Sequence, residues 1–284
     1  TTQTHLVLMN PISLDHLIKQ ALEEDLGMGD WSSQWLFDAS TRKNGRFVAK
    51  QSGIFAGMPI VERVYNALGG GVELSWLVED GQGFEKGSIL AHVNGPVGTL
   101  LSGERVILNL LQHLSGIASS TQELIRRLDD PSIKVVDTRK TLPGLRMVQK
   151  YAVRCGGGFN HRFRLDDGVM IKDNHITAAG SIEKAVELVR KQQGHMIKIE
   201  VEVETLDHVQ QAVKAEVDVI MLDNQTSDQV KELRQHVPKS IIVELSGGIT
   251  PDNIAAYKGC GADVISVGWI THSVKACDIS FYID

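Results

Sequence analysis

Residues 197–204 read IKIEVEVE, and this stretch alternates apolar with charged side chains along its whole length. Because a strand directs successive side chains to opposite faces, the apolar set would share one face and the charged set the other. The charged set comprises Lys198, Glu200, Glu202 and Glu204. If the apolar face packs on helices, the charges point inward, and buried carboxylates then need cations, a metal or a polar ligand. The alternative is a Lys–Glu network that only holds strands together.

Five further apolar runs accompany this strand, and helical patterns lie between most of them. The runs are IKVVD (133–137), VMIK (169–172), VIMLDN (219–224), IIVELSGG (241–248) and VISVG (264–268). Strand–helix alternation predicts parallel strands joined by right-handed crossovers. A doubly wound sheet would satisfy this pattern, but every run ends in polar residues or glycine. That favours an α/β fold with a TIM-like β/α barrel, complete or incomplete, and a site at the C-terminal ends of its strands.

The first hundred residues follow a different pattern. An amphipathic helix carrying Leu14, Leu17, Ile18, Ala21 and Leu22 on one face is expected to end at Gly27–Gly29. From Gly45 to Leu101, short apolar runs separated by glycine, the last of them GTLLSG (98–103), predict strands around one helix at 60–68. We expect a small α+β domain here, followed by a long connecting helix over 104–128.

Composition narrows the class of protein. The 284 residues carry 29 Lys+Arg against 35 Asp+Glu, so a general nucleic-acid-binding function is not expected. No apolar run approaches the ~18 residues that a membrane span needs, and no signal peptide is visible. The three cysteines, Cys155, Cys260 and Cys277, are few, odd in number and widely spaced. These features predict a cytoplasmic protein without membrane or nucleic-acid partners.

Positive charge is concentrated between residues 137 and 172. This segment holds eight Lys and Arg residues against three Asp, inside a chain of net charge −6. Arg139, Lys140, Arg162 and Lys172 lie at or near strand ends, where a cationic group suits a multiply anionic ligand. Three further cations, Arg146, Lys150 and Arg154, follow helical spacing and are expected on an exposed helix face.

Glycines follow the last two predicted strands. Gly247 and Gly248 precede Thr250-Pro251-Asp252, which we interpret as the start of a helix, and Gly268 follows the final strand. Main-chain N–H groups beside such glycines can bind phosphate, and barrels commonly use the loops after their last two strands in this way.

These motifs resemble those of the quinolinate phosphoribosyltransferase family, also called nicotinate-nucleotide pyrophosphorylase (carboxylating). The likeness centres on DTRKTLPGLR (137–146), KYAV (150–153), GGGFNHR (156–162) and IKDNHI (171–176). It extends to EVE (202–204), LDN (222–224), SGGI (246–249), VG (267–268), ALEEDLGMGD (21–30) and GERVILNLLQHLSGIAS (103–119). It therefore covers essentially the whole chain.

The resemblance implies a reaction and an architecture. Quinolinate and phosphoribosyl pyrophosphate would give nicotinate mononucleotide, carbon dioxide and pyrophosphate in de novo NAD synthesis, with Mg²⁺ as cofactor. An N-terminal α+β sandwich domain (residues 1–115) would be joined by the C-terminal tail (271–284), and the barrel domain would span 116–270. The chain would form a homodimer or a larger assembly, in which the sandwich of one subunit closes over the barrel of the other.

The resemblance also assigns residues. Quinolinate would be held by the partner subunit's Arg105 and by Thr138, Arg139, His161, Arg162 and Lys172. Phosphoribosyl pyrophosphate would be held by Lys140, Glu202, Asp223, Ser246, Gly247, Gly248, Val267, Gly268 and Trp269. Lys140, Lys172, Glu202 and Asp223 would be catalytic. Mg²⁺ would be held mainly by the substrate pyrophosphate, with Glu202 and Asp223 as candidate ligands.

Three rival functions remain open from the residues alone. Lys140 and Lys172 at strand ends would also suit a Schiff-base aldolase, although both lie among other cations. A non-catalytic anion sensor could use the same fold, although inward carboxylates would repel its ligand. A transferase acting on nicotinate is the nearest alternative, and the number of cations favours the dicarboxylate.

Overall fold

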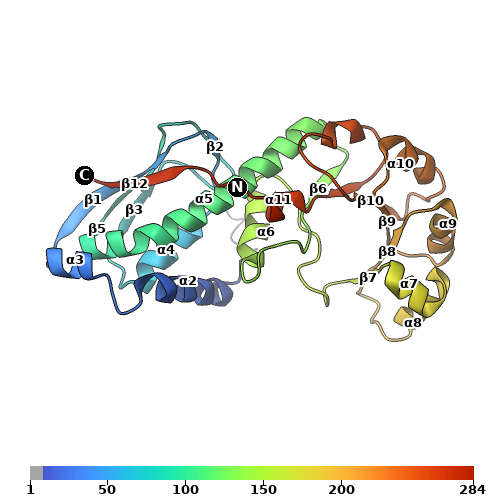
Figure 1. Cartoon of the computed structure of the whole chain (residues 1–284), viewed down its shortest axis with the longest axis horizontal. Helices are drawn as coiled ribbons and strands as arrows, with labels where there is room; N and C mark the ends of the chain where they lie inside the picture. Colours follow the sequence, from blue (N-terminus) through green and yellow to red (C-terminus); the bar gives the residue numbers. More distant parts are fainter. Residues whose placement is uncertain (1–8) are drawn as a thin grey trace. The chain divides into compact units, whose positions relative to one another are not determined.

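The computed structural model describes residues 9–284, which form two compact units (Figure 1). Of the described residues, unit 1 comprises 9–122, 141–157 and 273–284, and unit 2 comprises 123–140 and 158–272. The division differs from the sequence-based one because residues 141–157 lie with the first unit. Within residues 9–284, no helix is both long and apolar enough to cross a membrane.

Unit 1 is built on a four-stranded antiparallel sheet in the order β12-β1-β5-β3. Its strands are β1 (Arg42–Ala49), β3 (Glu73–Trp76), β5 (Ile89–Pro96) and β12 (Ile279–Ile283), so the C-terminal tail pairs with the first strand. Strands β2 (Gly53–Ile54) and β4 (Gly83–Phe84) form a separate pair. The helices are α2 (Pro11–Leu26), α3 (Trp31–Leu36), α4 (Met58–Ala67), α5 (Val97–Leu128) and α6 (Arg146–Cys155). The end of α5, from Glu123 onward, belongs to unit 2.

Helix α5 starts earlier than the sequence indicates, because the run GTLLSG (98–103) forms its first turns rather than a strand. Glycines on both sides of an apolar run are typical of strands bounded by turns. Here, however, Gly103 lies inside the helix and faces α4. A Cβ on Gly103 would lie 3.1 Å from Val64 Cγ1 and 3.2 Å from Leu68 Cδ1. The missing side chain thus allows α4 and α5 to pack closely.

Helix α6 also departs from expectation. Lys150 is fully buried rather than exposed, while Arg146 and Arg154 are half-buried. The i, i+4 spacing of the three cations is typical of a solvent-facing stripe. Nearly the whole helix is buried in unit 1, however, and tertiary packing overrides the pattern.

Unit 2 is an open six-stranded parallel sheet in the order β6-β11-β10-β9-β8-β7. The strands are β6 (Lys134–Val136), β7 (Val169–Ile171), β8 (Ile199–Val203), β9 (Val219–Asp223), β10 (Ile242–Ser246) and β11 (Val264–Ser266). The order is that of a barrel opened between β6 and β7, which confirms the incomplete form of the predicted fold. Phe159 bridges Val136 along the free edge of β6 and so extends the sheet there.

The crossover helices of unit 2 are α7 (Asp173–Ala179), α8 (Ile182–Arg190), α9 (Leu206–Lys214) and α10 (Ser227–Arg234), and Figure 1 shows them outside the sheet. Ser181, Thr205 and Thr226 accept main-chain N–H groups at the starts of α8, α9 and α10. The short helices η1 (Ile254–Tyr257) and α11 (Trp269–His272) follow β10 and β11. Residues 251–253 form a turn that leads into η1, so the helix begins four residues after the predicted start at Thr250.

Candidate active site

A cavity of about 660 Å³ lies in unit 2, where the six strands end. Every predicted site residue of this unit except Val267 lines it. These residues are Thr138, Arg139, Lys140, His161, Arg162, Lys172, Glu202, Asp223, Ser246, Gly247, Gly248, Gly268 and Trp269. The parallel register thus gathers residues from a stretch of more than 130 positions into one hollow.

Two predicted residues lie outside the cavity wall. Val267 is 1% exposed, and its N–H donates to Val136 O at 2.9 Å. That donor is therefore engaged within the sheet, and a main-chain contact of Val267 with phosphate stays a prediction. Arg105 is exposed on α5 in unit 1, and its role stays a prediction.

Cations dominate one part of the cavity wall. Burial, and repulsion from Arg139, lower the pKa of the Arg162 guanidinium, which donates through Nη1 to Gly168 O at 2.6 Å. Two guanidinium groups that destabilise each other gain free energy when an anion lies between or beside them. Lys140 and Lys172 extend the cationic wall. The arrangement is suited to a ligand with more than one negative charge.

Lys140 is held at the cavity by close contacts of its stem and main chain. Its N–H donates to Thr138 Oγ1 at 2.9 Å, and its carbonyl accepts from Thr271 Oγ1 at 2.7 Å. A Cβ on Gly268 would lie 2.7 Å from Lys140 Cδ. Gly268 is thus required for the lysine stem to lie where it does, which is a steric role in addition to the phosphate role expected from the sequence.

His161 meets two buried carboxylates. Its Nε2 lies 3.1 Å from Glu200 Oε2 on β8 and 3.4 Å from Glu244 Oε1 on β10. Glu200 is 7% exposed and Glu244 only 4%. Asp137, which is fully buried, accepts the His161 main-chain N–H at 2.9 Å and so fixes the segment that carries the ring.

We call His161, Glu200 and Glu244 the His161 cluster. Its two carboxylates control how many protons the cluster holds. Burial opposes charge on His161, but Glu200 and Glu244 outweigh it and raise its pKa to about 10. Burial, together with repulsion from Glu244, raises the pKa of Glu200 against the opposing contact with His161. The cluster therefore holds an extra proton at neutral pH that the separated groups would release.

The same three residues could in principle bind a metal, since their donor atoms lie within 4.8 Å of one another. The ring orientation argues against this. Nδ1 accepts the Arg162 main-chain N–H at 2.8 Å, so the ring proton is on Nε2, the atom that faces both carboxylates. A metal would have to displace that proton, and Nδ1 could not take it up while it accepts the Arg162 N–H.

The carboxylates predicted to face the cavity do so. Glu202 lies 3.4 Å from Lys172 Nζ, and the Glu202 side chain is 18% exposed. Asp223, at the end of the neighbouring strand β9, accepts a hydrogen bond from Asn224 Nδ2 at 2.7 Å. Lys198 and Glu204, the outer charges of the alternating stretch, are exposed at the strand ends and do not line the cavity.

The turn after β10 carries the predicted phosphate-binding glycines. Gly247 and Gly248 have φ angles of +99° and +63°, which residues that carry a side chain rarely adopt. Asn253 fixes the main chain on both sides of Ile249, because it donates through Nδ2 to Gly248 O at 2.8 Å and accepts the Thr250 N–H through Oδ1 at 2.8 Å.

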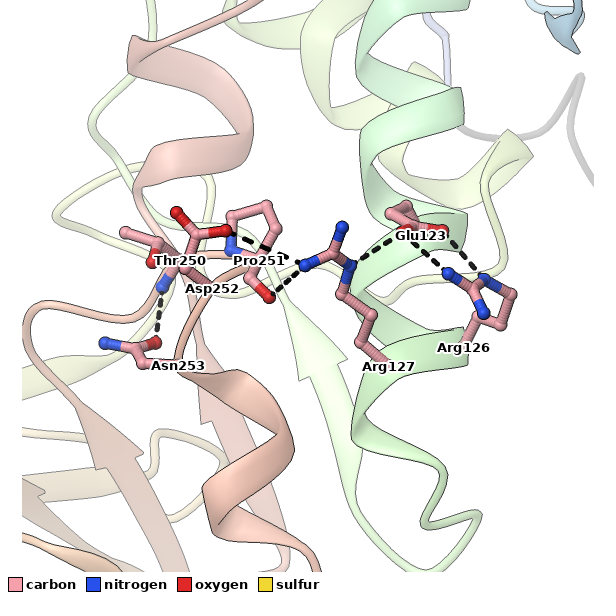
Figure 2. A network of polar contacts seen from close by, with 7 residues as sticks. All are labelled: Glu123, Arg126, Arg127, Thr250, Pro251, Asp252 and Asn253. Carbon is pink, nitrogen blue, oxygen red and sulfur yellow. Dashed lines mark hydrogen bonds and ion pairs between the residues drawn. The ribbon is translucent and has the colours of Figure 1, made fainter.

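Figure 2 shows how this turn is tied to the end of α5. Arg127 donates to Pro251 O at 2.9 Å and lies 3.7 Å from Asp252, while Glu123 pairs with both Arg126 and Arg127. The main chain of the turn is thus fixed before any ligand arrives, as a phosphate-binding turn requires.

Sequence reasoning missed Glu244, Asn224 and the bracing role of Asp137. Glu244 stands within the apolar run IIVELSGG, three positions before Gly247. A single acidic residue inside such a strand is the signal that could have revealed it. For Asn224 the available signal was weaker, since an asparagine after a strand is ordinary turn chemistry.

Comparison with known families adds independent information. The family model for the quinolinate phosphoribosyl transferase N-terminal domain matches residues 30–115, and the C-terminal domain model matches residues 117–282. A "Probable nicotinate-nucleotide pyrophosphorylase [carboxylating]" of Bacillus subtilis is 49% identical, covering 96% of this chain and 94% of the relative. The human "Nicotinate-nucleotide pyrophosphorylase [carboxylating]" is 36% identical, covering 96% and 93%. The crystal structure of NadC from Streptococcus pyogenes has a TM-score of 0.93 at 40% identity, covering 97% and 99% of the two chains.

Proposed function

The chain belongs to the quinolinate phosphoribosyl transferase family, and we propose that it catalyses the reaction of quinolinate with phosphoribosyl pyrophosphate. The products are nicotinate mononucleotide, carbon dioxide and pyrophosphate, a step of NAD biosynthesis. The observation that carries this proposal is the convergence of a cationic wall, two carboxylates and a glycine turn in one cavity. The two substrates bring carboxylates, a pyrophosphate, a ribose and a 5′-phosphate, and each has a complementary partner there.

Quinolinate binds at the cationic wall. Arg139 and Arg162 grip its two carboxylates, and Thr138 and Lys172 assist. His161 lies beside them, but both of its ring nitrogens contact protein groups in this structure. His161 can bind a quinolinate carboxylate only if one ring nitrogen gives up its present protein contact.

Phosphoribosyl pyrophosphate binds across the other residues of the cavity. The turn at Ser246, Gly247 and Gly248 receives the 5′-phosphate through main-chain N–H groups, helped by the start of α11 at Gly268 and Trp269. Glu202 and Asp223 bind the ribose hydroxyls. Lys140 and Lys172 lie where the pyrophosphate leaves, and Lys172 also forms the ion pair with Glu202.

The chain's own residues act mainly by position and charge. As the bond from the ribosyl carbon to pyrophosphate breaks, positive charge develops on the sugar, and Glu202 and Asp223 stabilise it. Lys140 neutralises the departing pyrophosphate. The pyridine nitrogen then bonds to the ribosyl carbon, and the resulting cationic ring accepts the electron pair released when the 2-carboxylate leaves as carbon dioxide.

We propose Mg²⁺ as the cofactor. The donor set fits, because Glu202 and Asp223 both line the cavity and offer the oxygen ligands that Mg²⁺ prefers, beside a substrate pyrophosphate. When bound, the ion neutralises pyrophosphate charge and so favours its departure.

We further propose a cytoplasmic homodimer in which Arg105 completes the partner's quinolinate site. Arg105 is exposed on α5 of unit 1, and several large apolar side chains of the same unit are exposed near α3, namely Met28, Trp31, Trp35 and Leu36. Trp31 and Trp35 stack at 5.3 Å between ring centroids. Apolar groups gathered in this way are typical of a surface that another chain covers. Three free, buried cysteines fit a reducing compartment.

Two variants test the assignment of the cavity. Arg162→Ala should raise the KM for quinolinate at least about tenfold with a smaller effect on the KM for phosphoribosyl pyrophosphate, because a charge-assisted contact is lost. Glu202→Gln should instead lower kcat. Arg164→Ala, at an exposed arginine outside the cavity, is the control and should leave both constants unchanged. Unchanged quinolinate KM in Arg162→Ala would remove the cationic wall from the proposal.

A further inference from the structure

Asn224 has an unusual backbone. It follows β9 directly, lines the cavity, and has a φ of +53°. Asparagine tolerates this left-handed conformation better than most residues, because its short amide can bond locally. In unit 2 the other non-glycine residues with positive φ are Asp129 and Glu216, and neither lines the cavity.

The side chain of Asn224 lies between two functional groups. Its Nδ2 donates to Asp223 Oδ2 at 2.7 Å. A Cβ on Gly247 would lie 2.3 Å from Asn224 Oδ1 and 2.7 Å from its Cγ, so the amide packs directly on the glycine. The Asn224 N–H also donates to Ser246 O at 2.9 Å, which joins the ends of β9 and β10.

We propose that Asn224 is a positioning residue that sets the Asp223 carboxylate relative to the phosphate turn. The proposal rests on the function proposed above, in which Asp223 binds the ribose and the turn binds its 5′-phosphate. Both groups belong to one sugar of fixed size, so the carboxylate and the turn must stand at a fixed separation. Asn224 is in direct contact with both, and its donor leaves the second carboxylate oxygen, Oδ1, for the sugar.

The residue type follows from these contacts. Aspartate would tolerate the backbone but place a second negative charge beside Asp223 in place of a donor. Alanine would lose the donor and strain the backbone. Glycine keeps the backbone conformation without strain and removes only the amide. Asn224→Gly is therefore the most informative variant.

In steady-state kinetics, Asn224→Gly should lower kcat/KM for phosphoribosyl pyrophosphate by about 10- to 100-fold, the usual effect of losing a hydrogen bond to a charged group. Both kcat and the KM for phosphoribosyl pyrophosphate should change, kcat falling and KM rising. The KM for quinolinate should stay within about twofold of the wild-type value. Asn224→Asp should be at least as impaired, despite its nearly identical shape. Glu216→Gly relaxes the same backbone conformation at an exposed position and is the matched control, expected to keep wild-type constants.

Binding of ribose 5-phosphate, measured by calorimetry on the full chain, separates this inference from the proposed function. Asn224→Gly should bind this probe at least about fivefold more weakly than wild type, even if the wild-type chain fails to turn over quinolinate. Equal ribose 5-phosphate affinity together with equal kcat would overturn the positioning role. A fall in kcat/KM for phosphoribosyl pyrophosphate that is accompanied by an equal rise in the quinolinate KM would also overturn the positioning role. That pattern indicates that the whole cavity has loosened.

Discussion

At the scale of single residues, neighbouring carboxylates of the cavity differ in burial and in the partners they contact. Glu202 and Glu200 are two positions apart on the same strand, yet Glu202 pairs with Lys172 whereas Glu200 is sealed against His161 and Glu244. Alternation in IKIEVEVE correctly predicted that both face inward. It could not predict their different partners, because Glu244 and His161 come from distant parts of the chain.

The His161 cluster predicts a specific pH dependence of stability. The raised pKa, about 10 where it is assigned to His161, belongs to the coupled cluster. Because Nδ1 accepts a main-chain N–H, the extra proton lies on the Nε2 and carboxylate side of the ring, and folding favours the protonated cluster. The stability that this proton contributes is complete below pH 6.5 and is lost as the pH rises toward 10. Glu244→Gln removes one carboxylate, lowers the pKa of the cluster, and should reduce this loss by about 1–3 kcal/mol.

Urea unfolding of wild type and variant at several pH values between 6.5 and 9.5 measures the difference. Other groups titrate in the same range, but they cancel in the comparison between the two proteins. Glu187→Gln removes an exposed carboxylate whose pKa is lowered to about 2, and it should not change the pH dependence in this window. Parallel curves for wild type and Glu244→Gln would contradict the raised pKa of the cluster.

At the scale of elements, the phosphate turn is held by neighbours that are remote in sequence. Periodicity located all six strands of the open barrel, because their apolar runs are short and bounded by polar residues or glycine. It failed at GTLLSG (98–103), where Gly103 serves close helix packing rather than a turn.

The contact in Figure 2 gives a test with a built-in control. Arg126 and Arg127 both pair with Glu123, but only Arg127 also reaches Pro251 O and Asp252. Arg127→Ala should loosen the turn and raise the KM for phosphoribosyl pyrophosphate by about 2- to 10-fold, as expected for one lost hydrogen bond. Arg126→Ala removes an equally charged, more exposed neighbour and should leave that KM unchanged. The same KM in both variants would show that the tie does not position the turn.

At the scale of the whole molecule, the chain comprises an antiparallel sheet with its helices and an open parallel barrel. The change of pattern near residue 100 predicted both. Assignment of residues 141–157 to the first unit was not predictable, because a helix between two barrel strands ordinarily packs on the barrel.

The proposed dimer predicts complementation between two damaged chains. Arg105→Ala and Lys172→Ala should each be nearly inactive alone, because each removes a cation from every quinolinate site. If Arg105 acts in the partner's site, mixed dimers contain one intact site, so activity should reappear after the two variants are mixed and allowed to exchange subunits. Lack of recovery, with subunit exchange verified by mass, would place Arg105 in its own chain's site or outside the site.

The most direct test of the central claim follows the carboxylate that the reaction removes. Quinolinate labelled in its 2-carboxylate is incubated with phosphoribosyl pyrophosphate, Mg²⁺ and the enzyme. We predict that labelled carbon dioxide, pyrophosphate and nicotinate mononucleotide form in equal amounts, and that nicotinate in place of quinolinate gives little product. Pyrophosphate release without labelled carbon dioxide, or turnover of nicotinate at the same rate, would contradict the account.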